Sequence, residues 1–176
     1  MPGSPTSPST SPRPTLVDAT AERIGHIARA LRAADARELA AQRWEWDPDA
    51  LVGEVMGYYG PFKWVCERAG EPIAAVGAVQ LHPGVWSAWM FATDEFPKIG
   101  LYLTRFVRRR MIPSLVRLGA HRCDARSIEG HDHAHRWLRA LGAVEEARLV
   151  RYGRNGEDFI VFRWDKPDVL QQAEST

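Results

Sequence analysis

The sequence contains few cysteines, no long apolar run and almost no net charge. Its two cysteines, Cys66 and Cys123, are too few for a disulfide-stapled scaffold, so we expect both to be reduced and buried. No apolar run is long enough to span a bilayer, and the N-terminus lacks the apolar segment of a secretory signal. A formal net charge of +1 gives no overall attraction to nucleic acid or to an anionic membrane. We therefore expect a cytoplasmic protein whose partner is neither a membrane nor a nucleic acid.

Composition divides the chain into two tails and one domain. Residues 1–14 consist almost wholly of proline, serine, threonine and glycine, which bury too little apolar surface to offset the entropy of ordering. We expect that tail to be disordered on its own. Hydrophobic residues make up 45% of the chain and charged residues 26%, as in an ordinary globular domain. The prediction is a single domain over residues 15–166, followed by a polar C-terminal tail over 167–176.

The first part of the domain predicts one short strand and two helices. The strand is expected over 15–17. Apolar residues at helical spacing then predict one long helix, which begins at 18 or 20 and ends near 42. A second helix is predicted after Asp47-Pro48 and ends by 57 or 60, since aspartate is a favoured N-cap and proline fits the first helical position.

Three strands and an arginine-rich helix follow. Strands are predicted over 62–68, 73–81 and 85–92. The third strand carries apolar residues at both alternating sets of positions, so we expect both of its faces to be covered. The helix is predicted over about 98–118, with Pro113 kinking or interrupting it because proline lacks the N–H of a helical residue.

The last part of the chain predicts a strand, a helix and a hairpin. The strand is expected over 121–127, and the helix begins at His131 and stops at Gly142. Two further strands, over 144–152 and 158–164, are separated by Asn155-Gly156. Asn-Gly is typical of a two-residue hairpin turn because both positions tolerate positive φ.

This order of elements resembles that of the GNAT acyltransferases. The helix after the fourth core strand keeps Ala134 and Gly142 at the spacing of a motif that GNAT proteins often carry there. The resemblance implies an α/β (mixed α+β) fold, with a mostly antiparallel sheet splayed between its fourth and fifth strands and flanked by four helices. The arginine-rich helix and residues 126–137 are also similar to GNAT-like proteins encoded by tailed phages.

The resemblance implies an N-acyltransferase that uses acetyl-CoA and acetylates a primary amine of a small molecule or protein by direct attack. Such enzymes hold the cofactor's pyrophosphate with backbone N–H groups of the loop that enters the central helix. In this sequence that loop has one glycine and contains Pro97, with Lys98 or Arg105 as compensating cations. The cofactor-binding residues that the resemblance implies are Phe91, Ala92, Thr93, Lys98, Ile99, Gly100, Thr104, Arg105 and Arg126.

The catalytic groups do not match the family's pattern residue for residue. GNAT enzymes often carry a tyrosine acid in the next helix, and the matching position here is Leu138, which cannot donate a proton. His131 or His135 is the candidate to replace that acid. Glu95 is a candidate base for the amine, together with the neighbouring Asp94 and a water held near His82.

The histidines before and within that helix also allow the hypothesis of a zinc site. Only His131 and His135 would share a helix face, however, because His133 has the spacing of a strand. We favour a cluster at a helix N-terminus and predict no metal.

Two functions stay open from the sequence. The first is the acetyltransferase. The second is a GNAT-fold protein without catalysis, used for interaction or for virion assembly within a phage particle, with the N-terminal tail as a possible contact. Trp44 and Trp46 lie between the two predicted N-terminal helices, where they either pin their loop to the domain or form an aromatic wall for a substrate.

Overall fold

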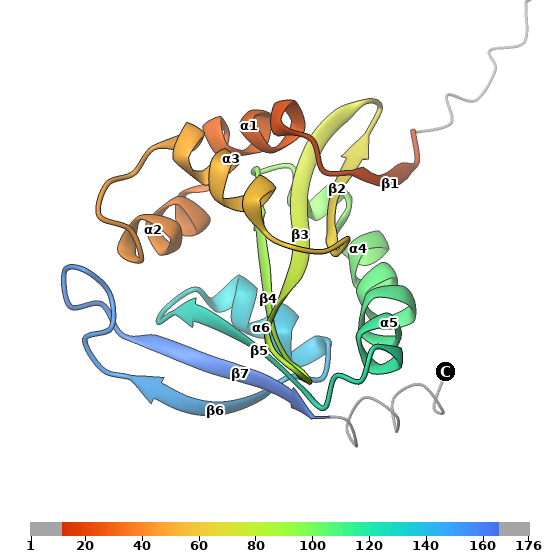
Figure 1. Ribbon diagram of the computed structural model, residues 1–176. Coiled ribbons are helices and arrows are strands. Elements are labelled where there is room, and N and C mark those ends of the chain that lie inside the picture. The colour runs from red at the N-terminus through yellow and green to blue at the C-terminus, as the bar shows by residue number, and fades with distance from the viewer. Residues whose placement is uncertain (1–11, 166–176) are drawn as a thin grey trace, which may run out of the picture.

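A mixed sheet of seven strands runs through residues 12–165, which the computed structural model describes (Figure 1). The predicted tails, 1–14 and 167–176, lie outside the described residues except for 12–14. The strands are β1 (Pro14–Asp18), β2 (Lys63–Arg68), β3 (Glu71–His82), β4 (Val85–Ala92), β5 (Arg122–Ile128), β6 (Val144–Leu149) and β7 (Phe159–Asp165). Their order in the sheet is β1-β2-β3-β4-β5-β7-β6, and all neighbours are antiparallel except the parallel pair β4 and β5.

The sheet is splayed between β4 and β5. These strands pair only where Val85–Ser87 faces Arg122–Asp124, whereas β5 pairs with β7 along its whole length. Beyond Ser87 and Asp124 the two strands diverge, and Figure 1 shows the opening between them. The predicted splay between the fourth and fifth strands is therefore confirmed.

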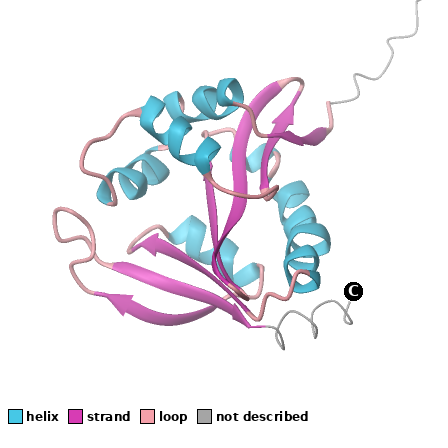
Figure 2. Ribbon diagram, viewed as in Figure 1, coloured by secondary structure: helices cyan, strands magenta, loops and turns pink. Residues whose placement is uncertain are grey.

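Helices cover both faces of the sheet (Figure 2). They are α1 (Ala21–Arg29), α2 (Ala33–Ala41), α3 (Pro48–Gly57), α4 (Gly100–Phe106), α5 (Ile112–Arg117) and α6 (Asp132–Ala140). The core on one face joins α1 and α3 to residues such as Val65 and Phe91. The core on the other face joins α4, α5 and α6 to Trp86 and Ala92, so both faces of β4 are covered as predicted. None of the helices within residues 12–165 has the length and apolar character needed to cross a bilayer.

The long helix predicted to end near residue 42 is wrong, because the chain forms two helices there. Thr20 caps α1 as expected, by accepting a hydrogen bond from the Arg23 N–H at 3.3 Å. The helix then stops at Ala30, Leu31 forms a bridge with Thr93, and the Arg32 N–H donates to the Ala92 carbonyl at 3.0 Å. A long-range backbone contact with the end of β4 therefore overrides the helical periodicity of the segment.

The central helix is interrupted as predicted, but it begins at Gly100 rather than Lys98. Lys98 belongs to a short 3₁₀ turn, Phe96–Lys98. A π-helical stretch, Val107–Met111, separates α4 from α5, and Pro113 lies in the first turn of α5. Proline there cannot donate the N–H that an uninterrupted α-helix needs, which accounts for the wider turn before it.

The prediction of a two-residue hairpin turn at Asn155-Gly156 is also wrong. Strand β6 ends at Leu149 and β7 begins at Phe159, so a longer loop over 150–158 joins them. Arg154 ties this loop to the N-terminal half of the chain, since its backbone N–H donates to the Ala41 carbonyl at 2.8 Å. Its guanidinium donates to the Trp44 carbonyl, also at 2.8 Å. Contacts with the end of α2 outweigh the local preference for a tight hairpin.

Candidate functional site

A cavity of about 370 Å³ lies where β4 and β5 diverge. Residues Ser87 to Phe91 of β4 form one wall, and Cys123 and Ala125 of β5 form part of the opposite wall. On the side of α5 and α6 the lining is apolar and includes Met111 and Leu138. On the side of α2 and α3 it is mixed. The polar residues there are Arg32, Asp35, Glu38, Gln42, Arg43, Glu54 and Tyr58, and the apolar ones are Leu39, Leu51 and Val55. The splay therefore produces a space with one apolar end and one end that carries most of the charged groups.

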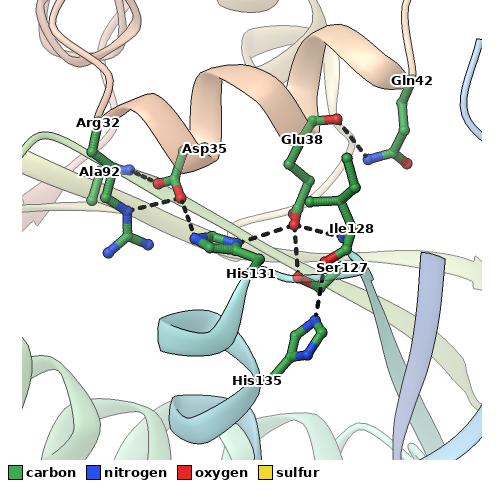
Figure 3. A network of polar contacts seen from close by, with 9 residues as sticks. All are labelled: Arg32, Asp35, Glu38, Gln42, Ala92, Ser127, Ile128, His131 and His135. Atoms are coloured by element: carbon green, nitrogen blue, oxygen red, sulfur yellow. Dashed lines mark hydrogen bonds and ion pairs between the residues drawn. The ribbon is translucent and has the colours of Figure 1, made fainter. Parts of the chain in front are cut away.

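Helix α2 lies across the wide end of this opening and bonds to the end of β4 (Figure 3). The Ala92 N–H donates to Asp35 Oδ2 at 2.7 Å, and the Ala92 carbonyl accepts from the Arg32 N–H at 3.0 Å. Arg32 Nε also pairs with Asp35 Oδ1 at 2.8 Å. Both backbone groups of Ala92 are therefore engaged by one turn of chain at the start of α2.

Glu38, one turn further along α2, bonds to the end of β5 (Figure 3). Its Oε2 accepts from the Ser127 hydroxyl at 2.7 Å and from the Ile128 N–H at 2.9 Å. The same oxygen lies 3.2 Å from His131 Nδ1. Through Asp35 and Glu38, α2 thus connects the two strands that the splay separates.

His131 lies between these two carboxylates and is only 5% exposed. We assign its proton to Nδ1, because Nδ1–H then donates to Glu38, the hydrogen-bond partner seen at this ring. Nε2 is then the basic nitrogen. It lies 3.3 Å from Asp35 Oδ1 but has no partner with hydrogen-bond geometry among the described residues. His131 lines the cavity, as a proton acceptor for a ligand there would have to.

Asp35 is 3% exposed, and burial raises the pKa of its carboxyl group above the ordinary 3.8. The charge and hydrogen bond of Arg32, the Ala92 N–H and the charge of His131 act in the opposite direction. Burial is the larger effect. The carboxylate that holds β4 is therefore less favourable in its charged form than a carboxylate in water.

The other two predicted catalytic residues do not line the cavity. His135 Nε2–H donates to the Ile128 carbonyl at 3.1 Å, and its ring packs 5.1 Å from that of Phe162. Burial, and next the charge of Arg139, lower the pKa of His135 below 6.5. Glu95 is exposed and pairs with Lys98. Of the three, the structure brings His131 to the cavity, and the catalytic roles of all three stay predictions.

The predicted cofactor residues at the end of β4 have mixed environments. The Phe91 side chain is buried in the core that α1 and α3 share. Ala92 is engaged by α2, as described above. The Thr93 N–H donates to the Ile73 carbonyl at 2.9 Å, and its hydroxyl accepts from the Glu95 N–H at 3.3 Å. These backbone groups are thus bonded within the chain.

The remaining predicted cofactor residues lie around α4 and β5. Ile99 is buried in the core, and the Thr104 hydroxyl donates to the Gly100 carbonyl at 2.7 Å while accepting from Trp137 Nε1 at 2.8 Å. A Cβ on Gly100 would lie 3.4 Å from the Phe96 ring, so that ring packs against this residue. Lys98 pairs with Glu95, and Arg105 is exposed. Arg126 lines the cavity and donates to the Tyr152 hydroxyl.

In this arrangement the residues at the end of β4 do not fit acetyl-CoA. An extended cofactor arm between β4 and β5 needs free backbone groups on the edge of β4, and α2 uses both of those on Ala92. The loop before α4 adds Pro97, which has no N–H, and the Phe96 ring against Gly100. The cavity itself is present, so the mismatch lies at the end of β4, which α2 covers, and in the loop before α4.

Cysteine and metal chemistry have little support at this site. Both cysteines are free, as predicted; Cys66 is buried and Cys123, which lines the cavity, is only partly so. Burial raises the pKa of the Cys123 thiol to about 12, so the nucleophilic thiolate is scarce at neutral pH. Within residues 12–165, no three histidine, cysteine, aspartate or glutamate side chains are grouped to hold a metal ion.

The sequence did not point to Asp35 or Glu38. Both lie on the polar side of a helical pattern, where carboxylates usually face water. Their spacing of three residues does place them on one helix face, next to Arg32, and that is the only local signal. Of the two tryptophans in the following loop, Trp46 packs against the core of α1 and α3, whereas Trp44 is 98% exposed.

No protein-family model matches the sequence, and no curated protein matches it in sequence. Solved structures match its fold. An acetyltransferase of the GNAT family from Bacillus anthracis matches with a TM-score of 0.66 and 10% identity, over 90% of this chain and 98% of that one. The ribosomal-protein-S18-alanine N-acetyltransferase from Escherichia coli matches with a TM-score of 0.63 and 15% identity, over 87% and 94%.

A third match is yncA from Salmonella typhimurium, solved with its cofactor acetyl-CoA; its TM-score is 0.61 and its identity 16%, over 86% of this chain and 93% of that one. The narrower likeness to phage-encoded proteins stays a prediction. At identities of 10–16%, a structural match is evidence for the fold alone. The matches cover 86–90% of this chain and 93–98% of the other chains. The chain therefore has the fold of the GNAT acetyltransferases.

Proposed function

We propose that this protein is an N-acyltransferase that moves an acetyl group from acetyl-CoA to a primary amine by direct attack of the amine. The observation that carries the proposal is the cavity of about 370 Å³ between the diverging strands β4 and β5, with His131 among the residues that line it. The fold supports it, since a solved structure of the same fold carries acetyl-CoA as its cofactor.

His131 is the residue that we expect to take the proton of the amine. An amine must lose its proton before it can attack a carbonyl carbon, and a neutral imidazole accepts protons near neutral pH. Glu38 holds Nδ1–H and fixes the tautomer that leaves Nε2 free. The Glu38 carboxylate, at 3.2 Å, would also stabilise the imidazolium that results. This role differs from that of the missing tyrosine, because His131 acts on the amine and not on the leaving group.

The polar end of the cavity offers a surface for the acceptor. Glu54 accepts from the Tyr58 hydroxyl and pairs with Arg43 at 2.6 Å. The Tyr58 ring lies 5.7 Å from that of Trp89, whose indole Nε1 is buried without a hydrogen-bond partner in the described part of the chain. Burial and Glu54 raise the pKa of the Tyr58 hydroxyl, which therefore stays a donor. An aromatic wall with a paired carboxylate suits an amine with an apolar substituent.

A second candidate is a GNAT-fold protein without catalysis that serves a protein assembly. It is favoured by the engagement of Ala92 by α2 and by Leu138 at the position of the usual acid. On this alternative the N-terminal tail would contact the partner.

Turnover with acetyl-CoA separates the two candidates. The purified protein is incubated with acetyl-CoA and a panel of primary amines, and the released thiol and the acetylated product are measured. We expect His131→Ala to lower kcat about 10²- to 10⁴-fold, as for loss of a general base. The exposed His133, in the first turn of α6, is the matched control, and His133→Ala should leave kcat unchanged. Equal rates for the wild type and His131→Ala would refute the role of His131, and absence of turnover with every amine would favour the second candidate.

A further inference from the structure

Helix α2 is held in place mainly by polar groups. Of its nine residues, only Asp35 and Ala41 are buried. In α1, by comparison, Ile24, Ile27 and Ala28 are all buried in the core. Burial of an apolar face supplies most of the stability of a helix in a protein, and α2 has little of it. Its N-cap residue, Arg32, also forms no side-chain cap. An element with few buried apolar contacts opens at a lower free energy than the rest of the fold.

The groups that hold α2 to β4 offer one hydrogen-bond acceptor and one N–H donor, as an amide does. Thr93 N–H bonds to β3, so the N–H and carbonyl of the preceding Ala92 point the other way, into the splay. Asp35 supplies one acceptor for that N–H and Arg32 supplies one backbone donor for that carbonyl. A secondary amide also presents one carbonyl oxygen and one N–H. The arm of a coenzyme A thioester contains two such amides, and either could replace the contacts of α2 at Ala92.

Release of α2 also returns a buried carboxyl group to water. Burial raises the pKa of Asp35, which shows that its charged form is less favourable where it lies than in solvent. The Arg32 guanidinium also lies over the Phe96 ring, with its Cζ 4.9 Å from the ring centre, so this side chain has a contact that does not involve Asp35. Breaking these contacts therefore exposes groups that water solvates well, in contrast to the opening of an apolar core.

We propose that the start of α2 is a displaceable latch on the donor site. Asp35 and Arg32 occupy the Ala92 edge of β4 in the free protein, and the amide arm of an acyl-CoA takes their place when it binds. Glu38, one turn further along, keeps its contacts with β5 and His131. This inference rests on the proposed function, because it takes an acyl-CoA to be the ligand that enters between β4 and β5. It accounts for the mismatch at Ala92 as a property of the closed state.

A latch lowers the apparent affinity of the ligand. If only a fraction of molecules has α2 released, the apparent dissociation constant equals the intrinsic constant divided by that fraction. Asp35→Ala removes the acceptor that holds the Ala92 N–H and should raise the released fraction. The variant should therefore bind acetyl-CoA more tightly than the wild type, which is the opposite of what removal of a binding residue does.

The test is calorimetric titration of acetyl-CoA into the wild type, Asp35→Ala and Asp49→Ala. Asp49 is the matched control, because it is an exposed carboxylate on α3 that pairs with Arg29. We expect a dissociation constant about tenfold lower for Asp35→Ala and no change for Asp49→Ala. Hydrogen exchange of the wild type gives a second measurement that needs no variant. Acetyl-CoA should speed the exchange of amides in the first turn of α2, residues 33–36.

The outcomes separate the latch from the proposed function. Equal dissociation constants for the wild type and Asp35→Ala, with exchange of α2 unchanged or slowed by acetyl-CoA, would overturn the latch and leave the transferase standing. If Asp35→Ala does not fold, the exchange of α2 in the wild type decides. If acetyl-CoA binds none of the three proteins, the proposed function fails and the latch fails with it.

Discussion

The carboxyl group of Asp35 makes the stability of the protein depend on pH. Its pKa in the folded protein is raised above 3.8, chiefly by burial. The folded protein therefore binds this proton more tightly than the unfolded chain does. The contribution of Asp35 to the free energy of unfolding falls as the pH rises from 3.8 through the raised pKa, and it is constant above that pKa.

Asp35→Asn removes this titration. We expect the melting temperature of the wild type minus that of the variant to fall as the pH rises through the window, and then to level off. Thermal unfolding of both proteins at a series of pH values measures this difference. Asp49→Asn, at an exposed carboxyl group, should show no such trend. A difference between wild type and Asp35→Asn that rises with pH would contradict the assignment.

Single residues were predictable here only where a motif marks them. His131 could be named as a candidate because it lies at a recognisable place before α6, and its catalytic role stays a prediction. Asp35 and Glu38 could not, because a carboxylate on the polar side of a helix looks the same whether it faces water or the end of a strand. Their partners, Ala92 and Ser127, are far away in the sequence.

At the scale of elements, Glu38 determines how firmly α2 and β5 are joined. One oxygen of Glu38 satisfies the Ser127 hydroxyl and the Ile128 N–H, and Ser127 and Ile128 are buried. Removal of the acceptor leaves both donors without this partner, and an unsatisfied buried donor costs about 1–3 kcal/mol.

We therefore expect Glu38→Ala to lower the free energy of unfolding by about 1–3 kcal/mol. Glu38→Gln, which keeps an acceptor oxygen, should lose less. Urea unfolding of each variant gives the free energies, and Glu45→Ala, at an exposed position in the next loop, is the control with an expected change within about 0.5 kcal/mol. If Glu38→Ala behaves like Glu45→Ala, then Glu38 does not join α2 to β5.

Elements were predictable where their ends are determined locally. Thr20 and Asp47 accept the N-cap hydrogen bonds that their residue types suggest, so α1 and α3 begin as predicted. The break between α1 and α2 depends instead on the pairing of Leu31 with Thr93. The loop over 150–158 likewise depends on Ala41. Neither contact leaves a signal in the local sequence.

At the scale of the whole molecule, the splayed sheet predicts a ligand effect that binding alone can test. Acetyl-CoA at about 100 times its dissociation constant should add about 2.7 kcal/mol to the free energy of unfolding. For a domain of this size, that corresponds to a rise in melting temperature of roughly 5–10 °C. Thermal unfolding with adenosine diphosphate in place of acetyl-CoA is the control for binding of the nucleotide alone. No shift at millimolar acetyl-CoA would contradict the transferase.

The architecture itself followed from the order of elements, because that order resembles one known fold and the structure has the predicted sheet. Whether α2 covers the cavity edge of β4 could not be predicted from the order of elements. Whether the edge of β4 is free depends on which side chains of α2 reach it, and the order of elements is the same in either case.

The short parallel pairing of β4 with β5 has a consequence for how the protein assembles. Strands β2, β3 and β4 pair with their neighbours in the chain, and so do β6 and β7, which makes most contacts within each half short in sequence. The halves meet at Val85–Ser87 and through α2, and the bond of Glu38 to Ile128 joins residues 90 apart in the chain. Closing a long stretch has the greater entropy cost. We therefore expect each half of the sheet to form early in folding and α2 to dock last. Docking of α2 would then join the two halves into one cooperative unit.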